Sequence, residues 1–246
     1  MEEEKRTYSP WTIGGFVLAV LAGLAEVLAG AGTRWQWWNY RTGLAILPWA
    51  AGGGIAAGVI SHGGCVVCRR DRRRGFILAV IGLLAAIVVF AIPWSYRLTA
   101  RRVPAIHDIT TDTQNPPRFV AVLPLRKGLN PAVYGGPEVA AKQHAAYPDI
   151  VPLELPLPPD RAFALALGAA RSLGWRIVDK NPSEGRIEAT DTTFWFGFRD
   201  DIVVRVAPFN QGSRIDVRSE SRVGKSDLGT NARRIRGYLN KIREME

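Results

Sequence analysis

Residues 75–94 read GFILAVIGLLAAIVVFAIPW, a run without a single charged side chain. An α-helix rises about 1.5 Å per residue, so about 20 apolar residues cross the roughly 30 Å hydrocarbon core of a bilayer. A helix of a soluble protein would carry polar residues along one face at 3.6-residue spacing, and this run carries none. We therefore predict a membrane-spanning helix at this position.

Two further apolar runs precede it, at about 13–31 and 43–61. The second contains Pro48 and Gly52-Gly53-Gly54, which are better tolerated in a helix surrounded by lipid than in one surrounded by water. The chain thus divides into a three-helix membrane anchor over residues 1–98 and a charged domain over residues 99–246. The lipid bilayer is the first expected partner.

The basic residues between the spans predict the orientation. The run RRDRRR occupies residues 69–74, and loops rich in arginine stay in the cytoplasm. The N-terminus and loop 62–74 would then be cytoplasmic and the C-terminal domain periplasmic, in a bacterial inner membrane. Trp35, Trp37, Trp38, Tyr40, Trp94 and Tyr96 would all lie at the outer interface. A cleaved signal peptide over residues 1–31 is an alternative that leaves the later topology unchanged.

Two features of the anchor stay without an assigned role. Glu26 is the one ionisable residue well inside a span, either a relay or a carboxyl that protonates or pairs with Arg34 or Arg41. Cys65 and Cys68, with His62 nearby, have the spacing of a zinc or redox site, but a second ligand pair is lacking, so we expect no metal and favour reduced or lipidated thiols. The net charge of +10 is concentrated partly in residues 69–74, where topology explains it, so we expect no nucleic-acid partner.

The C-terminal domain shows an α+β pattern. Residues 98–150 are rich in proline, with a strand-like run only at 118–125. Helical patterns follow at Pro159 to Gly174 and from a cap at Ser226 to the chain end, where Leu228, Ala232, Ile235, Leu239 and Ile242 form an apolar stripe. Strand patterns lie between them. We predict an antiparallel sheet with two helices packed on one face.

Two turns predict the strand register. A turn at 199–201 would place Phe196 opposite Val204, and a loop at 209–212 would place Val204 opposite Val217. The other face of the sheet would then carry Trp195, Arg205, Arg214, Asp216 and Arg218. Aromatic stacking and charged hydrogen bonds on that face could hold an anionic ligand, and an Arg205–Asp216 ion pair is the structural alternative.

The turn 219–227 before the last helix is a second candidate. Its free amides, with Arg222 and Lys225 nearby, could bind phosphate or carboxylate, unless Asp227 itself occupies the helix start. Motifs of the types G-x-S-x-G, H-E-x-x-H and Walker are absent from the sequence, and no cofactor is expected. Asp108, Asp112, Asp149, Asp191 and Asp201 could supply a catalytic carboxylate pair, but their spacing selects none.

Four segments resemble the uncharacterised family catalogued as domain of unknown function 1499: IHDITTDTQNPPRF (106–119), QHAAYPDI (143–150), GRIEATDTTFWFGFRDD (185–201) and SRIDVRSESRVGKSDLGTNARRIRGYL (213–239). The resemblance implies no reaction. It does imply which positions matter: His107, Asp108, Asp112, Pro117, Tyr147, Pro148, Asp149, Asp191, Asp201, Arg205, Asp216, Arg218, Ser219, Ser221, Arg222, Gly224, Asp227 and Asn231.

Together, the candidate ligand-binding residues are Trp195, Arg205, Asp216, Arg218, Ser219, Ser221, Arg222, Asp227 and Asn231. We expect a binding or scaffold module of the bacterial cell envelope that recognises an anionic component or a membrane protein. The alternative is an envelope hydrolase or transferase that uses clustered aspartates.

Overall fold

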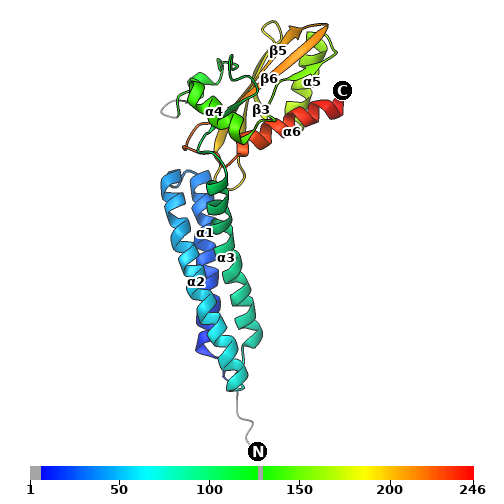
Figure 1. Ribbon diagram of the computed structural model, residues 1–246. Helices are drawn as coiled ribbons and strands as arrows, with labels where there is room; N and C mark the ends of the chain where they lie inside the picture. Colours follow the sequence, from blue (N-terminus) through cyan, green and yellow to red (C-terminus); the bar gives the residue numbers. More distant parts are fainter. Residues whose placement is uncertain (1–6, 127–129) are drawn as a thin grey trace, which may run out of the picture. The chain divides into compact units, whose positions relative to one another are not determined.

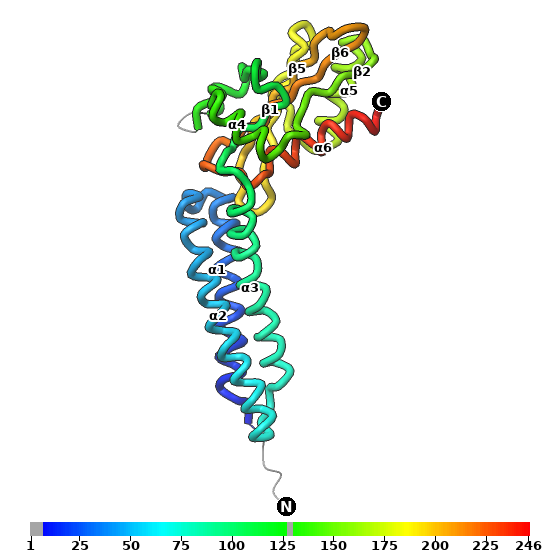
Figure 2. Tube along the Cα trace, viewed as in Figure 1, coloured from blue at the N-terminus to red at the C-terminus, as the bar shows by residue number. Residues whose placement is uncertain are grey.

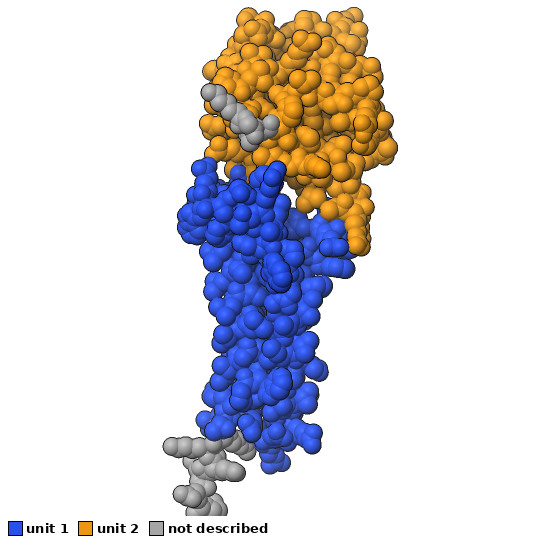
Figure 3. Space-filling view, turned by 90° about the vertical axis from the view of Figure 1, so that its left-hand side faces the viewer, with its two compact units in different colours: residues 1–99, 194–197 blue, residues 100–193, 198–246 orange. Residues whose placement is uncertain are grey.

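The computed structural model describes residues 7–126 and 130–246 and divides into two units. One unit contains residues up to Thr99 together with Phe194–Gly197, and the other contains Ala100–Thr193 and Phe198–Glu246. Figure 3 colours them separately.

The helical unit is built from α1 (Pro10–Arg34), α2 (Tyr40–Arg70) and α3 (Phe76–Arg102), which lie side by side (Figures 1 and 2). All three are apolar and long enough to cross a membrane. Each is longer than the run predicted from hydropathy, because charged and aromatic residues continue the helix beyond its apolar part. Helix α2 runs to Arg70, so most of the expected loop 62–74 is helical, and only residues 71–75 connect α2 to α3.

Small residues at heptad-like spacing face the interior of the helical unit. Ala19, Ala57 and Ala86 meet there, one from each helix. A Cβ added at Gly15 would lie 2.4 Å from the Ser61 Oγ atom, so the α1 and α2 backbones approach closely at this level. Small side chains permit such an approach in membrane helices. Glu26 also faces this interior, and its Oε1 atom has no hydrogen-bond partner within the described residues.

The second unit has the predicted α+β class. Four consecutive strands form the centre of its antiparallel sheet: β3 (Arg176–Asn181), β4 (Arg186–Thr192), β5 (Arg199–Phe209) and β6 (Gly212–Ser221). Two short strands, β1 (Asp108–Thr110) and β2 (Leu153–Leu155), pair one after the other with the edge of β6 that faces away from β5. This covers backbone groups that an exposed edge would offer to another chain.

Helices α5 (Pro159–Ser172) and α6 (Thr230–Met245) pack on one face of the sheet (Figure 1). As predicted, Val204 pairs with Val217 and Arg205 pairs with Asp216. The apolar residues of alternating positions, such as Ile202, Val204 and Ile215, form the core with the two helices. Tyr238 is fully buried there and stacks on Trp175 at 4.7 Å between ring centroids.

Three local predictions were wrong. Residues 194–198 are not a strand: the β4–β5 connection spans residues 193–198, and Ile187 rather than Phe196 lies opposite Val204. Residues 118–125 do not form a strand either, and a 3-10 helix, η1 (Leu123–Arg126), ends this segment before α4 (Gly136–Ala146). Finally, α6 begins at Thr230 instead of after Ser226, because Leu228 has a left-handed φ of 54° and interrupts the helical backbone.

Candidate functional site

The polar face of the sheet is largely covered by the segment between β1 and α4, which we call the covering segment. Phe119 and Val122 of this segment pack on Val203, which points away from α5 and α6. The segment therefore lies on the face opposite the two helices. The arginines of strand β6 that were predicted to face a ligand meet this segment instead.

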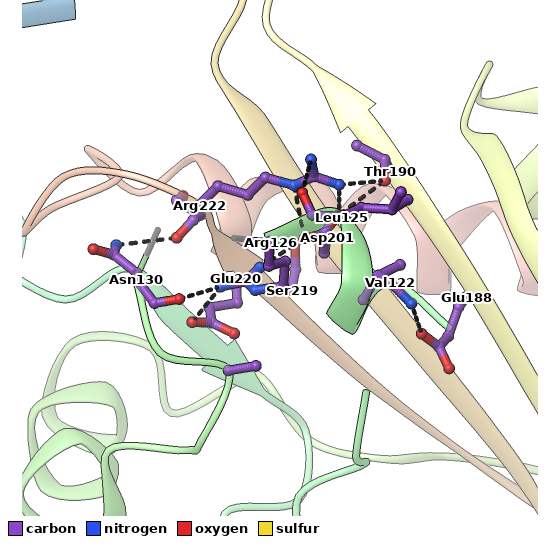
Figure 4. A network of polar contacts seen from close by, with 12 residues as sticks. Val122, Leu125, Arg126, Asn130, Glu188, Thr190, Asp201, Ser219, Glu220 and Arg222 are labelled. Atoms are coloured by element: carbon purple, nitrogen blue, oxygen red, sulfur yellow. Dashed lines mark hydrogen bonds and ion pairs between the residues drawn. The ribbon is translucent and has the colours of Figure 1, made fainter. Parts of the chain in front are cut away.

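Asp201 is the centre of a buried charge network under the segment (Figure 4). Its carboxylate accepts hydrogen bonds from Arg222 Nε at 2.9 Å and Nη2 at 2.8 Å, from Arg126 Nη1 at 2.7 Å and from Thr190 Oγ1 at 2.8 Å. Arg222 Nη1 also donates to the Leu125 carbonyl at 3.1 Å. Arg222, the residue that follows β6, thus ties the end of this strand to β5 and to η1.

A second part of the network surrounds Glu220. Arg126 Nη2 donates to its Oε1 atom at 2.8 Å, and Arg218 Nη2 lies 3.5 Å from its Oε2 atom. Arg218 forms a two-bond pair with Asp108, at 2.9 and 2.8 Å. Burial, with a smaller contribution from the Asp108 charge, raises the pKa of Glu220 to about 8, although Arg126 and Arg218 act to lower it. Three arginines and three carboxyl groups are therefore buried together between the sheet and the covering segment: Arg126, Arg218, Arg222, Asp108, Asp201 and Glu220.

Glu188 holds the covering segment by its backbone. Its Oε1 atom accepts the N–H groups of Val120 and Ala121 at 2.9 and 3.0 Å, and Oε2 accepts that of Val122 at 2.9 Å. Arg186 Nη1 donates to the same carboxylate. These three backbone amides belong to a turn that pairs with no strand. The Glu188 carboxylate supplies the hydrogen-bond acceptors that buried amides require.

At the open end of the face, Arg205 and Arg214 are only partly covered. Arg205 Nη2 donates to Asp216 at 2.8 Å and to Asp112 at 3.0 Å, and Arg214 Nη2 donates to the same two carboxylates. Asp112 and Asp216 are thus held close together by the same two arginines. Asp112 is one of the candidate catalytic aspartates. Of the other candidates, Asp108 and Asp201 lie in the buried network around Glu220, whereas Asp149 pairs with Arg236 and Asp191 with Arg234. The five candidate aspartates are therefore divided among separate groups.

The remaining predicted residues lie on the helix side of the sheet. Asn231 accepts a hydrogen bond from Ser219 Oγ at 2.7 Å and donates to Ser221 Oγ at 3.0 Å. Asp227 accepts the N–H groups of Gly229 and Asn231, both at 2.8 Å, and so occupies the start of α6. Burial raises the pKa of the Asp227 carboxyl, while these two backbone bonds lower it. The turn 219–227 is therefore filled by its own side chains.

Arg234, which the sequence pattern did not single out, completes this cluster. It donates to Asp200 Oδ2 at 2.6 Å, to Asp191 Oδ2 at 2.9 Å and to Ser219 Oγ at 3.2 Å. Its position on the polar side of an amphipathic helix gave no sign that it would be buried. Trp195 lies elsewhere: it belongs to the helical unit, where its ring centroid is 5.9 Å from that of Tyr96. It does not face Arg205.

A groove with a volume of about 240 Å³ adjoins the open end of the polar face. Three arginines, Arg118, Arg186 and Arg205, line it together with one acidic residue, Glu184. Its remaining walls are less polar and come from Asn115, Pro116, Pro117, Val120 and Val203. Of the predicted site residues, only Arg205 contributes. Arg118 and Arg186 are 68 positions apart in the sequence, and no periodic pattern links them.

Comparison with known proteins places this unit in a family. The sequence matches the family described as Protein of unknown function (DUF1499) over residues 108–242, from β1 to α6. The chain belongs to this family. The DUF1499 match contains the charge network and the groove, whereas α1, α2 and α3 lie outside it.

Among curated proteins, none matches the DUF1499 chain significantly. Among solved structures, it is similar to the one described as the crystal structure of TTHA0849 from Thermus thermophilus, at 12% sequence identity and a TM-score of 0.24. That similarity covers 39% of this chain and 97% of the other. At this level it assigns no role to the DUF1499 groove.

Proposed function

We propose that this protein is a membrane-anchored binding module of the bacterial cell envelope, which takes a small anionic ligand in the groove beside Arg118. The anchor is the set of three apolar helices, of 25, 31 and 27 residues, each sufficient to cross a bilayer. The ligand class follows from the lining of the groove, in which cations outnumber the one acidic residue.

The proposed orientation rests on the basic residues around the α2–α3 connection. Arg69, Arg70, Arg72, Arg73 and Arg74 cluster there, and such clusters stay on the cytoplasmic side. Since each helix crosses the membrane once, α3 then leads out of the cytoplasm, and the DUF1499 unit is periplasmic in an inner membrane.

Enzyme fusions in a Gram-negative host test this orientation. Alkaline phosphatase, which folds only outside the cytoplasm because it needs disulfides, should be active when fused after Glu246 and inactive when fused after Asp71. The opposite pattern would place the DUF1499 unit in the cytoplasm and would contradict the proposed location.

The observation that carries the ligand proposal is the set of unused donors in the groove. Arg118 is exposed and makes no hydrogen bond or ion pair with the described part of the chain. Arg186 bonds through Nε and Nη1, and Arg205 bonds through Nε and Nη2. One terminal nitrogen of each is therefore left without a partner among the described residues. Guanidinium donors that converge in this way suit a phosphate or carboxylate group.

The ligand should also have an uncharged part. Pro116, Pro117, Val120 and Val203 provide an apolar wall next to the donors, and a cavity of this volume suits a group about as large as a sugar or glycerol unit. Glycerol phosphate and glucuronate represent the two anion types on a compact polar body.

Calorimetric titration of the full-length protein in a neutral detergent tests the site. Glycerol phosphate or glucuronate should bind, and glycerol and methyl glucoside should not. Arg118→Ala should weaken binding at least tenfold, because a charged hydrogen bond contributes about 1.5–3 kcal/mol. Arg161→Ala, an exposed arginine on α5 on the opposite side of the sheet, is the matched control and should bind like the wild type. Absence of binding by both anions, or equal binding by the Arg118 variant, would refute the proposed site.

A further inference from the structure

The connection between β4 and β5 is unusually aromatic. Residues 193–198 read TFWFGF, and Phe194–Gly197 group with the three helices rather than with the sheet. Turns of this kind are ordinarily built from Gly, Asn, Asp, Ser and Pro. Four of its six residues are aromatic, and three of these, Phe194, Trp195 and Phe196, belong to the part that groups with the helices.

Two helix glycines make room for the aromatic rings. A Cβ at Gly30 would lie 2.1 Å from Trp195 Cδ1, and a Cβ at Gly43 would lie 3.1 Å from Phe196 Cε1. No side chain larger than hydrogen fits at Gly30 while Trp195 stays in place. The loop is thus seated in notches of α1 and α2, and it is a built part of the helical unit.

These notches lie at one end of the predicted spans. Gly30 is four residues before the last residue of α1, and Gly43 is three residues after the first residue of α2. Trp35, Trp37 and Trp38 occupy the connection between these helices. Tryptophan is enriched where a spanning helix leaves the hydrocarbon core. The loop therefore sits at the level of a membrane–water interface.

Phe194 is the aromatic residue of this loop whose side chain is exposed. Its side chain is 91% exposed, while its carbonyl oxygen accepts a hydrogen bond from Arg34 Nη1 at 2.7 Å. The Arg34 guanidinium also lies 6.0 Å from the Phe194 ring centroid. An exposed benzyl ring held beside an arginine matches the pairing of apolar groups and cations that binds the interface of a bilayer.

We propose that the loop Phe194–Gly197 is a lipid-contacting element, in which Phe194 inserts at the boundary between headgroups and acyl chains of the membrane that holds the three helices. The seated rings of Trp195 and Phe196 fix the loop, and Phe194 carries the lipid contact. The partner is the bilayer itself, not a soluble ligand, so this inference is independent of the groove.

Site-specific fluorescence in vesicles tests the contact. Full-length protein with Cys65 and Cys68 changed to serine would carry Phe194→Cys, labelled with an environment-sensitive dye. It would be reconstituted in vesicles of phosphatidylcholine and phosphatidylglycerol, with or without a nitroxide quencher near the top of the acyl chain. The control is Ser183→Cys, exposed in the turn at the other end of β4, about 20 Å along the hairpin.

The label at position 194 should emit at shorter wavelength and should be quenched several-fold more strongly than the label at position 183. Equal quenching at the two positions would overturn the proposal. Disulfide formation between copies through the cysteine introduced at position 194, without lipid quenching, would also overturn it, because the loop would then be a contact between proteins.

Discussion

Changing Asp201 to asparagine should destabilise the α+β unit by roughly 3 to 5 kcal/mol, the usual cost of removing one partner from a buried ion pair. The Asp201 side chain has 0% exposure, and Arg126 and Arg222 both depend on it. Asparagine keeps the shape but removes the negative charge, and its amide group would face guanidinium donors. Among the described carboxyl groups, Arg126 would then keep only its bond to Glu220, and Arg222 would lose the carboxylate that it pairs with.

Thermal unfolding of the full-length protein in a neutral detergent measures this effect. We expect a fall in the Tm of the α+β unit by roughly 10 °C for Asp201→Asn. Asp149→Asn is the matched control, because Asp149 also pairs with an arginine, Arg236, but is 55% exposed. An exposed pair contributes about 0–1 kcal/mol, so the control should shift the Tm little. Similar shifts for the two variants would mean that Asp201 is not buried in a charge network.

Glu188→Gln is expected to release the segment that covers the polar face. A carboxylate can accept three backbone N–H groups, whereas a glutamine side chain has a single acceptor oxygen and would turn its NH2 group toward at least one of them. Each buried donor left without a partner costs about 1–3 kcal/mol, and Arg186 loses a counter-charge as well. We expect a total loss of roughly 2 to 4 kcal/mol.

Limited trypsin digestion and thermal unfolding report this change together. Cleavage after Arg126, which is buried in the native protein, should become faster in the Glu188 variant. Glu184→Gln is the control: Glu184 is 56% exposed and pairs with the same arginine through Nε. If Glu184→Gln and Glu188→Gln behave alike, the three backbone bonds to Glu188 do not hold the segment.

The sheet was predictable where local signals agree. Alternation along β5 and β6, with a short loop at 209–212, predicted that Val204 pairs with Val217 and Arg205 with Asp216, and both pairings are confirmed. The α5 helix was predictable from Pro159 at its start and Gly174 after its end, where φ is +75°. These features depend on neighbours along the chain, so periodicity reveals them.

The failures have long-range causes. Residues 194–198 alternate like a strand, but Gly197 has a φ of +68°. The rings of Trp195 and Phe196 fit notches formed by Gly30 and Gly43, which lie 165 and 153 residues earlier in the chain. The role of Glu188 likewise depends on amides 66 to 68 positions away. No spacing rule in one sequence connects such distant residues. Local alternation therefore favours a strand at 194–198, and it does not show that the covering segment lies on the sheet.

The same point applies to the candidate site. Arg218 was predicted on the polar face of the sheet and Arg222 in the turn before the last helix, but a pattern of alternation does not tell whether the polar face is covered. In the structure their donors are used by Asp108, Asp201 and the carbonyl oxygen of Leu125. Arginine donors without partners among the described residues also line the groove beside Arg118, which the sequence pattern did not reveal.

The central claim is that the covering segment closes the polar face over Arg218 and Arg222. Hydrogen exchange measured by mass spectrometry on the full-length wild-type protein in detergent tests this claim most directly. If the segment covers the polar face, the amides of Val120, Ala121 and Val122, all bonded to Glu188, should exchange about as slowly as the ladder amides of β5. Exchange within seconds at these three amides, with β5 still protected, would contradict the account, because Arg218 and Arg222 would then be open to solvent and available to a ligand.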